Sequence, residues 1–135
     1  MSGEKNLATL LESLEPNLLP ETYVFHSSND LSLQCAAALN PIALFQESEG
    51  LSLVLTKAAA EQLGINILGI FKCITLSVHS SLEAVGLTAA VAEKLSQHDI
   101  SANVVAAFYH DHIFVPESKA ELALELLREF KGKAS

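Results

Sequence analysis

The stretch ITLSVHSSLEAVGLTAAVA, residues 74–92, decides the fold class of this chain. Just before and within it, Cys73, Thr75 and Ser77 alternate with apolar residues, as expected for a half-buried strand. Ser80 then stands three residues before Glu83, which is the spacing of a capping box at a helix start. The sequence therefore predicts a strand over 65–78 and a helix over 80–97.

The flanking sequence continues this alternation of strands and helices. Toward the C-terminus, strands are predicted over 102–109 and 113–115, a turn at His110-Asp111-His112, and a final helix from the capping box Ser118–Glu121. Toward the N-terminus, the predicted elements are a helix over 6–14 that Pro16 and Pro20 end, strands over 23–27, 42–46 and 51–55, and a helix over 57–63 between a Thr56 cap and a Gly64 stop. Residues 29–40 fit neither period and are read as a loop or a weak helix.

A weak internal repeat divides the chain. LVLTKAAAE (53–61) and IFVPESKAE (113–121) each lead from a strand into a helix behind a hairpin. We therefore expect an N-terminal half over residues 1–68, which begins with a helix, and a C-terminal half over residues 69–135. The first half is the more degenerate, because residues 29–40 stand where the second half has a clear helix.

Composition excludes several classes of protein. The 135 residues are 50% hydrophobic with a net charge of −8, so a packed core is expected and disorder is not. Only 8 Lys and Arg residues leave too little positive charge for a nucleic acid or an anionic membrane. No signal peptide is evident, and Cys35 and Cys73 are read as reduced core thiols, so a cytoplasmic location is expected.

Several segments together resemble a known family. The quoted stretch, ISANVVA (100–106) and YHDHIFVP (109–116) resemble small bacterial tandem ACT-domain proteins and the ACT modules of the animal cytosolic arginine sensors. YVF (23–25) and PIALFQESEGLSLVL (41–55) are similar to the same family. The resemblance implies an α+β fold of two ferredoxin-like βαββαβ halves, with antiparallel sheets that pair side by side and helices on one face.

The resemblance also implies a ligand site. ACT units usually bind an amino acid where two units meet, against the turn from the first strand into the first helix and against the second strand. On this chain those elements are 79–86 and 101–105. The residues expected to bind a ligand are His79, Ser80, Ser81, Leu82, Val85, Gly86, Asn103, Val104 and Asp111. Whether the first half carries a site stays open.

Each candidate has a functional and a structural interpretation. Free N–H groups at the start of the helix favour a carboxylate, although Ser80 and Glu83 are also explained as a cap alone. Gly86 allows either a ligand or a neighbouring backbone to approach closely. The Asn103 amide can bind both a carboxylate and an ammonium group, or can satisfy the backbone.

The remaining candidates lie at the predicted turn near the C-terminus. Asp111 could receive an ammonium group or could simply form the turn. His110 and His112, with His79, suggest a metal site less strongly than they suggest exposed or ligand-rim histidines, because zinc needs three or four converging ligands.

No catalytic motif is present in the sequence. We therefore expect a regulatory or sensing module that binds an amino acid or similar metabolite, and neither an enzyme nor a protein with a cofactor or metal. A homodimer formed by sheet pairing is expected. The alternatives are a ligand-free interaction module and a small metal-binding enzyme that uses His79, His110 and His112.

Overall fold

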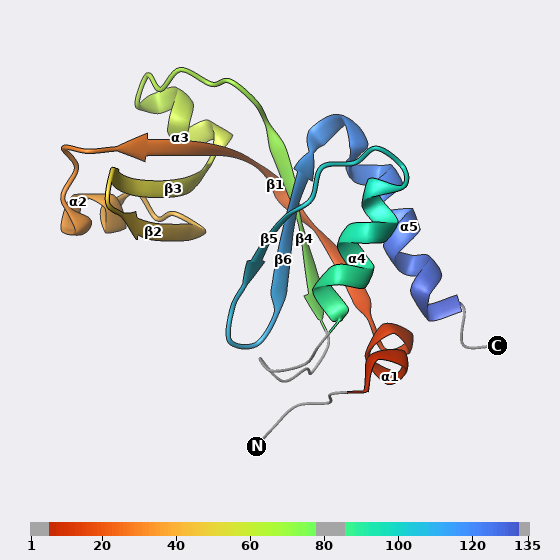
Figure 1. Ribbon diagram of the computed structural model, residues 1–135. Helices are drawn as coiled ribbons and strands as arrows, with labels where there is room; N and C mark the ends of the chain where they lie inside the picture. The colour runs from red at the N-terminus through yellow and green to blue at the C-terminus, as the bar shows by residue number, and fades with distance from the viewer. Residues whose placement is uncertain (1–5, 78–85, 133–135) are drawn as a thin grey trace. The chain divides into compact units, whose positions relative to one another are not determined.

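The computed structural model describes residues 6–77 and 86–132, and they form two compact units (Figure 1). One unit, the split unit, combines the segment that ends at Pro20 with the segment that begins at Lys72, and the other, the central unit, is Glu21–Phe71. The elements are α1 (Leu7–Glu12), β1 (Glu15–Ser28), α2 (Leu33–Ala38), β2 (Ala43–Glu47), β3 (Gly50–Thr56), α3 (Lys57–Gln62), β4 (Phe71–Ser77), α4 (Leu87–Ser96), β5 (Asn103–Ala106), β6 (Asp111–Pro116), a 3₁₀ turn (Glu117–Lys119) and α5 (Ala120–Gly132).

The central unit contains a small antiparallel sheet in the order β2-β3-β1. The predicted hairpin at Glu49-Gly50 is confirmed, since Glu47 pairs with Gly50. A Cβ atom at Gly50 would lie 2.5 Å from the carbonyl oxygen of Ser28, so this position requires glycine. The core of the unit joins one face of the sheet to the helices α2 and α3 through Val24, Ala36, Leu53, Leu55 and Ala60.

The helix caps of the central unit follow the sequence. Thr56 accepts a hydrogen bond from the Ala59 amide at 3.2 Å and so caps α3, as predicted. Ser32 accepts one from the Cys35 amide at 3.1 Å, which caps α2 and confirms the helical alternative for residues 29–40. Cys35 is exposed, so its prediction as a core thiol is wrong, because it lies on the solvent side of a helix of only six residues.

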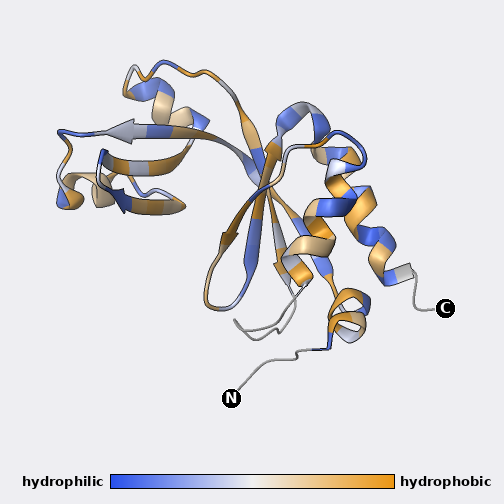
Figure 2. Ribbon diagram, viewed as in Figure 1, coloured by the Kyte–Doolittle hydropathy of each residue, from blue (hydrophilic) through white to orange (hydrophobic). Residues whose placement is uncertain are grey.

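The split unit contains strands in the order β1-β4-β6-β5, and Figure 1 shows α4 and α5 on the same face of these strands. Figure 2 shows hydrophobic and hydrophilic residues interspersed along α5, as expected for an amphipathic helix. The core includes residues from the sheet, from the three helices of the unit and from the loop before β5, namely Leu10, Leu14, Ile74, Leu76, Leu87, Val91, Leu95, Ile100, Ile113, Val115, Ala120, Ala123, Leu124, Leu126, Leu127 and Phe130. Cys73 is fully buried as predicted, and burial raises the pKa of its thiol to about 11.

Several element bounds differ from the sequence prediction, and the strand predicted over 102–109 ends at Ala106. β1 is longer than predicted and includes Pro16 and Pro20. Residues 15–20 lie in the split unit, where β1 is the edge strand, and an edge strand tolerates proline because one side of it donates no ladder hydrogen bonds. β4 begins only at Phe71, and Asp111 and His112 lie within β6 rather than at a turn.

An α+β fold of antiparallel sheets with helices on one face is confirmed. The division at 68/69 stays a prediction, and the structure adds a feature that the sequence did not indicate. The leading helix α1 packs against α4 and α5, so the start of the chain belongs to the split unit. No helix among the described residues is both long and apolar enough to cross a membrane.

Candidate functional site

Gly86 marks the beginning of α4. It is the N-cap residue, and its φ of 98° lies in the left-handed region that glycine adopts without strain. The predicted continuous helix over 80–97 is therefore wrong, because a residue with this φ cannot lie within an α-helix. Gly86 has no side chain to cap the helix, so the first N–H groups of α4 receive no hydrogen bond acceptor from it.

Close packing adds a second, weaker reason for a glycine at position 86. A Cβ atom placed there would lie 3.2 Å from Cδ2 of Leu7, at the start of α1. Both sequence interpretations of this glycine required a close approach, and the approaching group within the described residues is a leucine side chain.

Asp111 begins β6 at the end of the sheet where β4 finishes at Ser77 (Figure 1). Its carboxyl group is half-buried, and burial raises its pKa while the neighbouring His112 lowers it to a smaller extent. Asp111 lies on the same face of β6 as the core residues Ile113 and Val115. A half-buried carboxylate without a full hydration shell gains from binding a cation or an ammonium group.

His112 and Thr75 join the two central strands of the split unit on the opposite face of the sheet. Thr75 Oγ1 lies 3.0 Å from His112 Nδ1, and Thr75 is the one buried polar residue among the described side chains. Burial lowers the pKa of His112, and so does the charge of His110, whereas Asp111 raises it. The neutral imidazole is therefore favoured at this position.

Asn103 and Val104 begin the edge strand β5. The Asn103 Nδ2 group donates a hydrogen bond to the Phe114 carbonyl oxygen at 3.2 Å, so part of this amide satisfies the backbone. Asn103 is paired with Phe114 and Val104 with Ile113 in the register of the hairpin. Val104 packs against the core beneath the helices, so by the alternation of a strand the Asn103 side chain leaves from the other face.

The structure thus distributes the predicted site residues over two faces of one sheet. Val104 and Asp111 lie on the face that carries the helices, where α4 begins at Gly86, and Asn103 lies on the other face with His112. The other five predicted site residues, His79, Ser80, Ser81, Leu82 and Val85, lie outside the described residues. Within the described ranges 6–77 and 86–132, no three His, Cys, Asp or Glu residues converge on a possible metal position.

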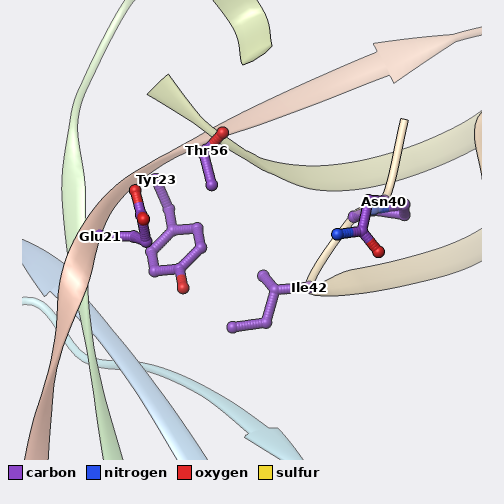
Figure 3. Close-up of a pocket in the computed structure, with 6 residues that line it drawn as sticks. Glu21, Tyr23, Asn40, Ile42 and Thr56 are labelled. Carbon is purple, nitrogen blue, oxygen red and sulfur yellow. The ribbon is translucent and has the colours of Figure 1, made fainter. Parts of the chain in front are cut away.

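The central unit contains a pocket of about 360 Å³ that the sequence did not indicate. It is lined by Glu21, Tyr23, Asn40, Pro41, Ile42 and Thr56 (Figure 3). These residues come from the part of β1 in this unit, the connection between α2 and β2, and the end of β3. Only the pairing of the strands brings these three segments together, and no local sequence motif marks them.

Comparison with known families gives two adjacent matches. One family model described as an ACT domain matches residues 2–72, and a second model with the same description matches residues 70–129. None of the curated proteins matches the chain.

Solved structures show the same arrangement. A Vibrio cholerae protein of unknown function, described as a possible transport protein, is 52% identical, with a TM-score of 0.86 over 94% of this chain and 97% of that one. An Agrobacterium tumefaciens protein is 18% identical, with a TM-score of 0.69 over 87% of this chain and 89% of that one. Clostridium acetobutylicum aspartate kinase, described as an allosteric enzyme, is 11% identical, with a TM-score of 0.64 over 94% of this chain and 36% of the kinase. At these lower identities, the last two matches establish the fold alone.

Proposed function

From the premise that this chain belongs to the ACT-domain family, we propose that it is a regulatory or sensing module that binds an amino acid and catalyses no reaction. ACT domains are typically regulatory modules for small ligands, often amino acids. The two ACT matches together cover residues 2–129. A cytoplasmic location remains a prediction of the sequence.

The single observation that carries this proposal is the placement of Gly86 and Asp111 on the helix side of one sheet. The first N–H groups of α4, which receive no cap from Gly86, attract an α-carboxylate, because the helix dipole places positive potential there. The half-buried Asp111 carboxylate attracts an α-ammonium group. An α-amino acid carries both charged groups on one carbon atom, so we expect it to bind the two groups together. His79, Ser80, Ser81, Leu82 and Val85 would complete the site.

The test is a thermal-shift screen of the purified protein against the common amino acids, followed by calorimetric titration of any ligand found. A ligand at about 100 times its Kd raises the free energy of unfolding by about 2.7 kcal/mol, which is easily detected. Asp111→Asn should weaken the binding of that ligand roughly tenfold, because a charge-assisted hydrogen bond is lost. Ser81→Ala should weaken it by a smaller factor.

The matched control is Glu125→Gln, which removes one exposed carboxylate from α5 of the same unit. It changes the net charge by the same amount as Asp111→Asn, and we expect it to leave the affinity unchanged. Equal affinities of the wild type and Asp111→Asn would reject Asp111 as a ligand group. If no amino acid stabilises the protein, the ligand-free interaction module becomes the better explanation.

The proposal includes self-association through the edge strand β5. This strand ends the order β1-β4-β6-β5, so one of its sides is not paired within its sheet. Phe108 and Tyr109, in the loop that follows, are 74% and 72% exposed. Sedimentation velocity should therefore show a dimer. Val105→Lys, which places a charge on the edge strand, should shift the protein toward the monomer.

A further inference from the structure

The pocket of the central unit is built on paired strands. Glu21 and Tyr23 stand two residues apart on β1 and therefore project from the same face of that strand. Tyr23 is paired with Thr56 of β3, and the amide of Ile42 donates a hydrogen bond to the Val54 carbonyl oxygen at 2.9 Å. The loop at residues 40–42 is thus held against the sheet. The volume of the pocket, about 360 Å³, lies within the usual range for small-ligand sites.

The charge of the pocket selects a cation. Glu21 is the one charged residue of its lining, and no Lys, Arg or His lines it. Among the described residues, the Glu21 carboxylate has no ion pair or hydrogen bond. The net charge of −8 for the whole chain adds to the attraction. A ligand carboxylate or phosphate would find no positive partner here and would be repelled by Glu21.

The remaining walls suit an ammonium group on a short aliphatic body. Figure 3 shows the Tyr23 ring extending from β1 into the space between Glu21 and Ile42. An aromatic ring attracts a cation through its quadrupole, and Ile42 and Pro41 provide apolar surface for methylene groups. Thr56 Oγ1 accepts the Ala59 amide with one lone pair, so its second lone pair is available to accept from a bound ammonium group.

Asn40 supplies a further polar group to the lining of the pocket. Its φ of 54° places it in the left-handed region, which asparagine tolerates better than most residues. Its side-chain amide makes no hydrogen bond with the described residues, so its oxygen can accept from a bound ammonium group.

We propose that this pocket of the central unit binds a small primary aliphatic ammonium ion, with Glu21 as its counter-ion and Tyr23 and Ile42 as its walls. The site lies in the central unit, whereas the amino-acid site proposed above lies in the split unit, so each is tested without the other. A ligand of this class needs no carboxylate, which distinguishes it chemically from the amino acid.

The probes are n-butylammonium, putrescine, n-butanol and butyrate, each titrated into the full chain labelled with ¹⁵N and followed by amide chemical shifts. We expect both amines to shift the amides of residues 21–23, 40–42 and 56, with a Kd of about a millimolar for so few atoms. Butanol should bind at least tenfold more weakly, and butyrate should cause no shift there.

Two variants test the contributions of the Glu21 carboxylate and of the Asn40 side-chain amide. Glu21→Gln should weaken amine binding roughly tenfold, whereas the control Glu49→Gln, which removes an exposed carboxylate of the same unit at the β2–β3 turn, should leave it unchanged. Asn40→Gly keeps a residue that accepts positive φ while removing the amide, so it should weaken binding a few-fold with the fold intact.

The proposal is overturned by any of three results. The first is equal binding of butylammonium and butyrate. The second is equal loss of affinity in Glu21→Gln and Glu49→Gln, which would indicate general attraction to an acidic protein. The third is amine-induced shifts confined to residues outside the pocket. A spectrum of each variant without ligand confirms that it has folded before its affinity is compared.

Discussion

At the scale of the residue, His112 makes the stability of the split unit depend on pH. Its pKa is lowered in the folded protein, so the unfolded chain binds more protons as pH falls through the ordinary pKa of about 6.5. The stability that neutral His112 contributes is therefore complete above that pH and is lost as pH falls toward its folded pKa. We expect His112→Gln to lower Tm by about 2–5 °C at pH 8, where the bond to Thr75 is complete, and by less at pH 5.

The measurement is thermal unfolding of both proteins between pH 5 and pH 8, with His98→Gln as the control. His98 is exposed just beyond the end of α4, and among the described residues its ring bonds only the carbonyl oxygen of Lys94, one turn back. The decisive quantity is the difference in Tm between the wild type and His112→Gln. A difference that stays constant across this range would contradict a titrating role for His112.

At the scale of the element, the start of α4 depends on the backbone of Gly86. An alanine at a φ of 98° is strained, so Gly86→Ala should lower the free energy of unfolding by about 1–2 kcal/mol. Gly86→Asn should cost less, because asparagine tolerates this region better. If contact with Leu7 were the cause instead, the larger asparagine would cost as much or more. Urea unfolding of the two variants separates these causes, and Gly69→Ala, at ordinary φ and 3.5 Å from the nearest atom, controls for an added methyl group.

Sequence patterns predict some of the helices and strands correctly and others wrongly. Local signals located the Thr56 cap, the hairpin at Gly50 and the buried Cys73, because capping, turn geometry and strand alternation depend on neighbours in the sequence. The spacing of Ser80 to Glu83 predicts a helix start at Ser80, and no local pattern reveals a left-handed Gly86. The pocket was missed for a related reason, since Tyr23 and Thr56 meet only through strand pairing.

At the scale of the whole molecule, the first segment of the chain completes the unit formed by the last. Leu10 and Leu14 are fully buried in the core of the split unit, and residues 15–20 supply its edge strand. The sequence could not indicate this, because the internal repeat aligns each strand and helix with its neighbours along the chain. Composition gives the amount of core, whereas the order of strands in space depends on pairings between distant segments.

Because the start of the chain belongs to the split unit, we predict that residues 69–135 do not fold alone. Truncating one buried leucine to alanine costs about 2–5 kcal/mol, so loss of Leu10, Leu14 and an edge strand together exceeds the stability of many small domains. Circular dichroism should show no cooperative unfolding for the fragment. A peptide of residues 6–20 added in trans should restore it, and the same peptide with Leu14→Asp should not. A cooperative transition of the fragment alone would contradict the structural dependence of the split unit on the start of the chain.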